Sequence, residues 1–337
     1  MSTSQLNNSN PIPNKQMQVV LDHLAKLGAY PPETVTPQVA RQLPTMAEAV
    51  IATISDDPLK KAVMPLALQI ESIEHKVISQ PADSSREIIL RIYTPKISAE
   101  SNLPVVVYFH GGGFVIANLN TYDASCRAIC KMAECIVVSV GYAQAPEFPF
   151  PAAVEDAVTA TKWVMENAGG FKGDFNKIAI AGESAGGNLA LAVNLTLKKQ
   201  GLKLPVHQLL IYPIADFEHQ STTYQTFADA KPLNAPMMNW FKKYYLKDQS
   251  QAKNELASVI KGDLAGLPPT TVILAEIDPL RGEGEQLIQK LSVAGVPTKS
   301  EIFKGVTHEF FGTYAVVDEA MKAVKLATDE LKIAFKS

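Results

Sequence analysis

The spacing of apolar residues changes twice along the chain. Up to about residue 68 they recur every three or four positions, as at Met17, Val20 and Leu24, a spacing typical of helices joined by Pro-rich turns. Short β-rich runs closed by turn residues follow, with a helical pattern around residues 121–133. The runs predicted to be strands are "HKVISQ", "REIILRIYTP", "LPVVVYFHGGG" and "AECIVVSVGY".

From Ala152 onwards, strands and helices are predicted to alternate. The helices are expected at residues 152–167, 185–199, 282–294 and 316–335. The strands are expected at residues 177–182 and in "VHQLLIYPI", "TTVILAEI" and "KSEIFKG". Alternation with continuously apolar strands predicts an α/β fold, with a mostly parallel sheet covered by helices on both faces. An irregular, aromatic insert at residues 215–260 interrupts it.

Composition and charge exclude several classes of protein. The chain has 337 residues, 47% hydrophobic and 19% charged, which is typical of a folded protein rather than a disordered one. The net charge is −3 and Lys and Arg form no block, so nucleic acid is not an expected partner. No run approaches the ~18 apolar residues that span a bilayer, and no integral membrane contact is expected.

The ends of the chain and its cysteines predict a cytoplasmic protein. The first 14 residues are polar, have no apolar signal core and are expected to be mobile. Cys126, Cys130 and Cys135 do not have the spacing of a metal site, and we expect reduced, buried thiols.

A serine stands at the junction of a predicted strand and a predicted helix. Residues 182–186 read Gly-Glu-Ser-Ala-Gly and fit G-x-S-x-G. In this context Ser184 is predicted to lie on a sharp turn, with its Oγ projecting from the carboxyl edge of the sheet. The amides at the start of the next helix would face any negative charge formed there. The alternative is a serine that only caps the helix.

A serine hydroxyl needs a base to remove its proton and an acid to orient that base. His308 is the predicted base, because it lies in the loop "GVTHEFFG" directly after a predicted strand. The alternative is an ordinary loop histidine. His23, His75, His207 and His219 have no turn signature beside them and are expected to be structural or exposed.

Asp278 is the predicted acid. It ends the strand "TVILAEI" and precedes Pro279, and the acid in the order Ser…Asp/Glu…His follows a strand. Glu276 is the competitor, but it lies two residues earlier on the same side of the strand. Asp before Pro is also a frequent turn former.

A glycine-rich loop supplies a further element of the site. His110-Gly111-Gly112-Gly113 follows a predicted strand, and backbone without side chains can turn its amides toward a substrate carbonyl. We therefore expect an oxyanion hole from this loop and the amide of Ala185. A phosphate-binding loop is the alternative, but neither GK[ST] nor G-x-G-x-x-G is present. His110 is expected to fix the loop by hydrogen bonding.

Five stretches between residues 105 and 311 resemble the hormone-sensitive-lipase-like family of α/β-hydrolases, the bacterial family IV esterases. They are "VVVYFHGGGF", "APEFPFPAAVEDA", "IAGESAGGNLA", "GLPPTTVILAEIDPLRGEGE" and "FKGVTHEFF". The resemblance implies an eight-stranded, mostly parallel sheet with an α-helical cap, and carboxylester hydrolysis through an acyl-enzyme without metal or organic cofactor. It implies Ser184 as nucleophile, His308 as base and Asp278 as orienting acid. The implied oxyanion-hole amides are those of Gly111, Gly112 and Ala185.

The resemblance also implies a division of the chain. Residues 1–70 would contribute to the cap, residues 71–214 and 256–337 would form the hydrolase core, and residues 215–255 would be the cap insert. Packing on the core should explain most apolar residues of the insert. The residues predicted to line the substrate pocket are Phe114, Met238, Trp240 and Phe241.

The chain departs from the family pattern at several positions. Gly141 and Ala143 replace an acid and an arginine, and losing both leaves no unpaired charge. Glu183 stands where Asp or Thr is commoner, and Gly282 replaces an acid. Glu309 replaces a glycine beside the predicted base, where it is expected to change the pKa of His308.

The sequence thus predicts a serine carboxylesterase acting on short- to medium-chain acyl esters, with a small-molecule ester as its partner. A homodimer is left open. The alternatives are an amidase or deacetylase with the same triad, and a ligand-binding member of the fold without catalytic activity.

Overall fold

The structure is a computed structural model that describes residues 10–59, 61, 69–96, 102–218 and 221–336. The first 14 residues are expected to be mobile, but residues 1–9 of that segment lie outside the described residues. The side chain of Asn14 caps the first helix by accepting a hydrogen bond from the amide of Met17.

One eight-stranded sheet forms the centre of the molecule, in the order β1-β2-β4-β3-β5-β6-β7-β8. β2 runs antiparallel to both its neighbours, and the other pairs are parallel. The strands are β1 (Ser72–Gln80), β2 (Asp83–Thr94), β3 (Leu103–Phe109), β4 (Ile136–Gly141), β5 (Gly173–Glu183), β6 (Gln208–Ile211), β7 (Thr270–Ile277) and β8 (Thr298–Thr307). Their carboxyl ends from β3 to β8 meet at one edge of the sheet.

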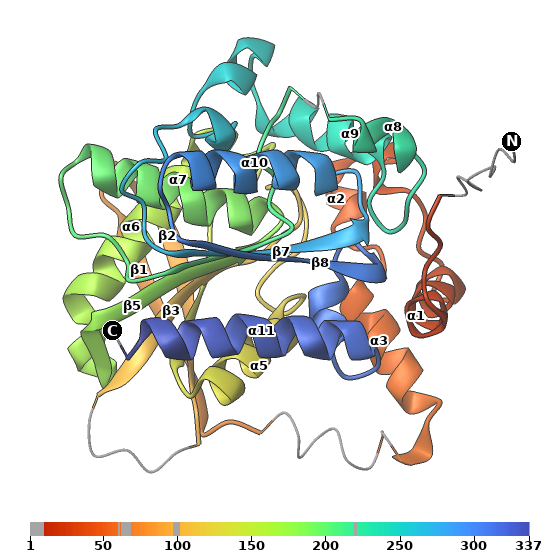
Figure 1. The fold of residues 1–337 in the computed structure, drawn as a ribbon, viewed down its shortest axis with the longest axis horizontal. Helices are drawn as coiled ribbons and strands as arrows, with labels where there is room; N and C mark the ends of the chain where they lie inside the picture. Colours follow the sequence, from red (N-terminus) through yellow and green to blue (C-terminus); the bar gives the residue numbers. More distant parts are fainter. Residues whose placement is uncertain (1–9, 60, 62–68, 97–101, 219–220, 337) are drawn as a thin grey trace, which may run out of the picture.

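Helices cover both faces of this sheet. α6 (Ala152–Asn167), α7 (Ala185–Lys199) and α10 (Arg281–Val293) lie on one face, and α5 (Asp123–Ala133) and α11 (Asp318–Ala334) lie on the other (Figure 1). Each face has its own apolar core, because the central strands present buried side chains alternately to the two sides. The predicted α/β-hydrolase fold is therefore confirmed.

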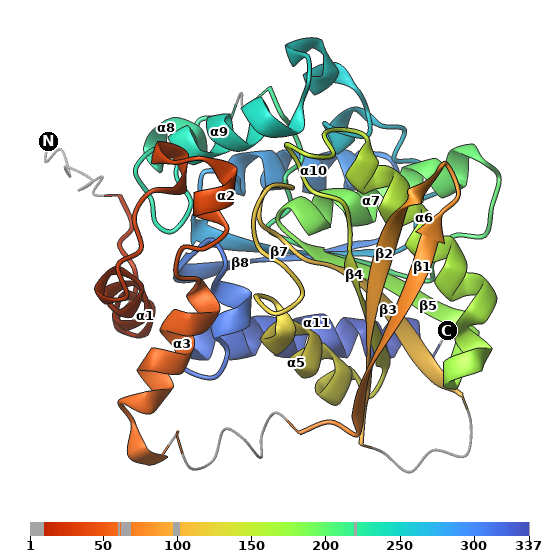
Figure 2. The ribbon, with the colours of Figure 1, turned by 180° about the vertical axis from the view of Figure 1, so that it is seen from behind.

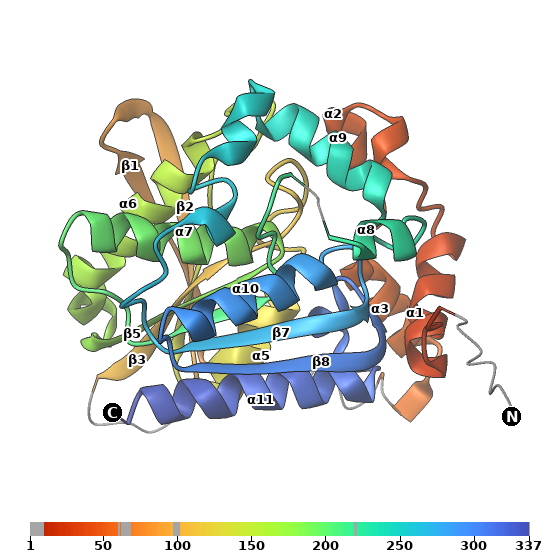
Figure 3. The same cartoon turned by 45° about the horizontal axis from the view of Figure 1, so that its top comes forward.

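The described helices before β1 and the α-helices between β6 and β7 lie together over the carboxyl edge of the sheet. The first group is α1 (Lys15–Lys26), the 3₁₀ helix η1 (Pro32–Thr34), α2 (Pro37–Ala40) and α3 (Met46–Ser55). The second is α8 (Thr223–Thr226) and α9 (Ala235–Tyr245). α2 lies near α9 in the views from behind and from above (Figures 2 and 3). Nε1 of Trp240 donates to the carbonyl of Val35 at 3.1 Å, which joins the two groups.

The predicted elements agree with the structure to within a few residues at most ends. β6 is shorter than the run "VHQLLIYPI", because Tyr212 takes a positive φ of 35° and Pro213 has no amide to continue the ladder. The insert is more regular than expected, since α9 forms eleven residues of helix there. No helix within the described ranges has the length and apolar character needed to cross a bilayer.

Candidate active site

Ser184 lies at the turn between β5 and α7. Its backbone has φ 56° and ψ −116°, a conformation that costs free energy for a residue with a side chain. Two glycines make the turn sterically feasible: a Cβ at Gly182 would lie 2.1 Å from the carbonyl oxygen of Gly186, and one at Gly186 would lie 2.0 Å from that of Phe109. The tight packing holds the serine at the carboxyl edge of the sheet.

Three side chains from three different strand ends form a hydrogen-bonded chain. Oγ of Ser184 lies 2.9 Å from Nε2 of His308, and Nδ1 of His308 lies 2.6 Å from Oδ2 of Asp278. Oδ1 of Asp278 accepts from the amide of Leu280 at 2.8 Å, which fixes the carboxylate. The structure therefore brings together the serine, histidine and aspartate predicted from the sequence.

The competing residues lie elsewhere. Glu276 accepts hydrogen bonds from the amide of Gly305 and from Nζ of Lys304, away from His308. His23 faces Asp56, His75 accepts from Arg91, and His207 lies 3.0 Å from Oγ1 of Thr271; His219 is outside the described residues.

The surroundings of His308 favour its protonated form. Burial lowers the pKa of His308, but the carboxylates of Asp278, Glu309 and Glu183 together raise it, with Asp278 contributing most, so the pKa lies above its ordinary value. An imidazolium formed during a reaction would be stabilised there. The predicted influence of Glu309 on this pKa agrees with this direction.

Glu183 contacts His308 indirectly, through Tyr212. Its buried carboxylate accepts hydrogen bonds from Oη of Tyr108, at 2.5 Å, and from Oη of Tyr212. Burial raises the pKa of Glu183, and the two phenols act in the opposite direction. The ring of Tyr212 lies 4.6 Å from that of His308, so the Glu183–Tyr212 contact restricts one side of the imidazole.

The glycine-rich loop follows β3 and reaches Ser184. Nδ1 of His110 lies 2.7 Å from the carbonyl of Gly111, and Oη of Tyr142 donates to the carbonyl of His110 at 2.8 Å. Burial lowers the pKa of His110 to about 4, so the ring is neutral and serves to fix the loop. Within the part of the chain that the structure describes, the amides of Gly112 and Gly113 donate to no protein acceptor.

The three loop glycines have different surroundings. Gly112 and Gly113 line the cavity above Ser184 and have positive φ values of 99° and 58°. Gly111 does not line it, and a Cβ there would lie 2.3 Å from Oη of Tyr122. Of the predicted loop donors, Gly112 therefore lines the cavity and Gly111 does not, whereas the neighbouring Gly113 does.

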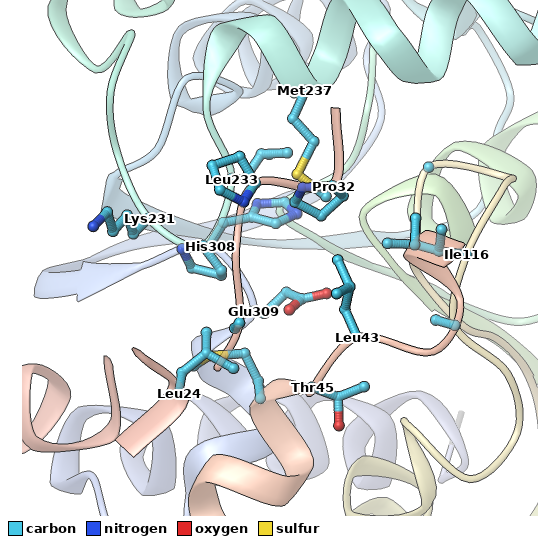
Figure 4. A pocket seen from close by; sticks show the side chains of 18 of the residues that line it. Leu24, Pro32, Leu43, Thr45, Ile116, Lys231, Leu233, Met237, His308 and Glu309 are labelled. Carbon is cyan, nitrogen blue, oxygen red and sulfur yellow. The ribbon is translucent and has the colours of Figure 1, made fainter. Parts of the chain in front are cut away.

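The cavity has a volume of about 510 Å³, a size suited to a small molecule (Figure 4). Ser184 and His308 line it, and its walls come from the N-terminal helical segment, the loop after β3 and the segment between β6 and β7. Representative wall residues are Leu24, Leu43, Ile116, Leu233 and Met237.

Of the four predicted pocket residues, only Phe241 lines this cavity. Met237 and Phe241 are four residues apart, share one face of α9 and line the cavity, whereas Met238 is fully buried and does not line it. Phe114 is fully buried and stacks on Tyr245 with ring centroids 3.8 Å apart. Phe114, Met238 and Trp240, which were also predicted to line the pocket, do not line this cavity and pack within the protein.

Two contacts of the cavity wall were missed by the sequence analysis. Arg41 of the N-terminal segment donates to the carbonyls of Val115 and Ala145, both at 2.8 Å, and forms a bidentate pair with Glu147. Oη of Tyr122 donates to Oε1 of Glu309 at 2.9 Å. Both contacts join residues far apart in the chain, and no local sequence pattern indicates them.

Comparison with known proteins agrees with this architecture. The family model described as "alpha/beta hydrolase fold" matches residues 106–312. The chain belongs to this α/β-hydrolase family. The predicted membership of the hormone-sensitive-lipase-like, bacterial family IV esterases is confirmed by this family model together with relatives that are named esterases.

Esterases are found among both the sequence relatives and the solved structures. Esterase LipI of Mycobacterium tuberculosis is 37% identical over 72% of this chain and 77% of its own length. An arylesterase of Saccharolobus solfataricus is 37% identical over 67% of this chain and 74% of its own. The hyperthermophilic esterase of Pyrobaculum calidifontis has a TM-score of 0.82 at 33% identity, covering 96% of this chain and 99% of its own.

Proposed function

We propose that this α/β-hydrolase cleaves carboxylic esters by a two-step reaction through an acyl-enzyme. The observation that carries the proposal is the Ser184–His308–Asp278 chain, with its 2.9 Å and 2.6 Å contacts, beside a cavity. His308 takes the proton of Ser184 as the oxygen attacks the ester carbonyl, and Asp278 stabilises the imidazolium. His308 then protonates the leaving alcohol and activates water for deacylation.

The oxyanion of the tetrahedral intermediate would be held by the amides of Gly112, Gly113 and Ala185. All three residues are at or beside Ser184, and their amides have no acceptor among the described residues. Ala185 is the first residue of α7, so the helix dipole adds to its effect. A donor of this kind typically contributes about 3–4 kcal/mol to transition-state stabilisation.

We further propose that residues 1–70 and 215–255 supply the cap of the cavity, over a core of residues 71–214 and 256–337. The described parts of both segments line the cavity, and the Trp240–Val35 hydrogen bond links them. A cap that encloses the serine restricts access, which favours short or medium acyl chains over long ones.

The test compares wild-type protein with Ser184→Ala on p-nitrophenyl esters from acetate to palmitate. Wild type should show a burst of p-nitrophenol and turn over the shorter esters faster. Ser184→Ala should show no burst, and its kcat should be at least a thousandfold lower. Ser292→Ala, which changes an exposed serine on α10, is the matched control. Retained turnover in Ser184→Ala, or failure of a fluorophosphonate to label Ser184, would contradict the mechanism.

A further inference from the structure

Glu309 follows His308 directly and has an unfavourable backbone conformation. Its φ is 63°, in the left-handed region that glycine adopts readily and that is unfavourable for a residue with a Cβ. Glu309 also lines the cavity that contains Ser184. A strained residue at the edge of a reaction site indicates that its side chain is used there.

A hydrogen bond holds the Glu309 side chain in the cavity. Oη of the buried Tyr122 donates to Oε1. Within the described ranges, Oε2 receives no hydrogen bond and no cationic side chain lies within 4 Å of the carboxylate. In Figure 4 the carboxylate extends from beneath His308 toward Leu43. One oxygen is therefore fixed and the other remains available to a ligand.

A second carboxylate lies in the wall formed by the N-terminal segment. Oε1 of Glu33 accepts from Nδ2 of Asn234 at 2.7 Å, and both residues line the cavity. Oε2 of Glu33 is buried and has no hydrogen-bond partner among the described residues. A buried carboxylate oxygen without a partner costs free energy, which a positively charged ligand would offset.

The cations of the cavity wall do not neutralise these carboxylates. The guanidinium of Arg41 is committed to Glu147 and to the carbonyls of Val115 and Ala145. Figure 4 shows the ammonium of Lys231 pointing away from His308. Because Arg41 is paired with Glu147, the acidic lining residues Glu33, Asp229 and Glu309 leave the described cavity wall with an excess of negative charge.

We propose that the cavity selects esters that carry a positive charge, such as an ammonium group, a few atoms from the ester carbonyl, and that Glu309 is the specificity-determining residue. The inference rests on the proposed ester hydrolysis. The carboxylates of Glu309 and Glu33, both of which line the cavity, attract the cationic group, while the apolar wall accepts the remainder of the substrate. A neutral substituent of the same shape gains the apolar contacts but not the charge interaction.

The test uses pairs of esters that differ only in charge. Acetylcholine and 3,3-dimethylbutyl acetate carry the substituent on the alcohol, whereas the p-nitrophenyl esters of 4-(trimethylammonio)butyrate and 5,5-dimethylhexanoate carry it on the acyl group. For wild type, kcat/KM of the cationic member should exceed that of the neutral one by about tenfold in at least one pair. The pair with the higher ratio identifies the side of the ester that Glu309 faces. The ratio should fall as salt is added.

Substitutions at Glu309 then test its role. Glu309→Gln should lower the charged-to-neutral ratio about tenfold, and Glu309→Gly should do the same while relieving the backbone strain, which guards against loss of folding. Glu134→Gln is the matched control. Glu134 is also at positive φ, at the end of α5, but it is exposed and pairs with Lys332. This variant should keep the wild-type ratio.

The outcomes separate the two proposals. Equal kcat/KM for both members of each pair, in a wild type that hydrolyses p-nitrophenyl acetate, would overturn the preference for cations and leave ester hydrolysis standing. An unchanged ratio in Glu309→Gln and Glu309→Gly would overturn the role of Glu309. A wild type without activity on any ester would contradict the proposed function and, with it, this inference.

Discussion

Arg41 and Glu147 form a bidentate ion pair between the N-terminal helical segment and the loop that follows β4, with N–O distances of 2.9 and 2.7 Å. The guanidinium lowers the pKa of Glu147. Because Arg41 also binds the carbonyl of Val115, the pair holds a wall of the cavity against the loop that carries Gly112 and Gly113.

We expect Arg41→Ala to raise KM about tenfold, with a smaller fall in kcat, because the wall loses its attachment while the triad stays intact. Glu147→Gln keeps the hydrogen bonds from Arg41 to the carbonyls of Val115 and Ala145, so its effect should be weaker. Steady-state kinetics on p-nitrophenyl butyrate measures both. An equal effect of the two substitutions would mean that the ion pair, not the carbonyl contacts, holds the wall.

The raised pKa of His308 sets the acid limb of the pH profile. The histidine must be neutral to accept a proton, so kcat/KM should fall as the pH decreases through a pKa above the ordinary value of 6.5. Asp278→Asn removes the largest contribution that raises this pKa. Its acid limb should move to lower pH, and kcat should fall about 10⁴-fold. Asp329→Asn, at an exposed carboxylate on α11, is the control; an acid limb below pH 6 in wild type would contradict the assignment.

Gly112 tests the oxyanion loop. A Cβ there would lie 2.2 Å from the carbonyl oxygen of Ile116, and φ is 99°, so Gly112→Ala must displace the loop. We expect kcat to fall about 10²–10³-fold, the usual effect of losing one oxyanion donor. Gly295→Ala has a similar φ of 75° but open space around the added carbon, and it should reduce stability without this loss of kcat. Thermal melting of both variants separates folding from catalysis.

Glu283 makes stability depend on pH. It accepts hydrogen bonds from the amide of Ala215 and from Oη of Tyr224, which join α10 to the start of the insert. Burial raises the pKa of Glu283 from 4.5 to about 8, although these donors act in the opposite direction. A raised pKa in the folded state gives stability that is complete below pH 4.5 and is lost as the pH rises through 8.

The melting temperature of Glu283→Gln minus that of wild type should therefore increase from pH 5 to pH 9, because only wild type loses stability as Glu283 ionises. Differential scanning calorimetry at the two pH values measures this change. A constant difference in melting temperature would show that Glu283 titrates near its ordinary pKa in the folded protein.

Much of the fold and the triad could be predicted from the sequence because both depend on local signals. Each of the three triad residues follows a strand: Ser184 in the G-x-S-x-G turn, Asp278 before a proline and His308 in a loop. The carboxyl ends of parallel strands lie at one edge of the sheet, so the three residues come close together. The chain order of Ser184, Asp278 and His308 then leaves few alternatives.

The cavity wall could not be predicted in the same way. Which face of α9 turns inward depends on how the helix packs against η1 and the loop after β3, so the sequence predicts Phe241 but not Met237 as a lining residue. Likewise Gly111 and Gly113 look alike in the sequence, and only their surroundings in the fold distinguish them: Tyr122 packs against Gly111, whereas Phe241 packs against Gly113. The Arg41 contacts link residues more than 70 positions apart, beyond any local pattern.

The position of His308 after the last strand has a consequence during synthesis. In a nascent chain Ser184 is present long before the proposed base, His308, has been translated, and β8 must add to the sheet edge before the two side chains can meet. Under the proposed mechanism, fragments that end before residue 308 would therefore contain an unactivated alcohol, and the hydrolase would become active only as folding is completed.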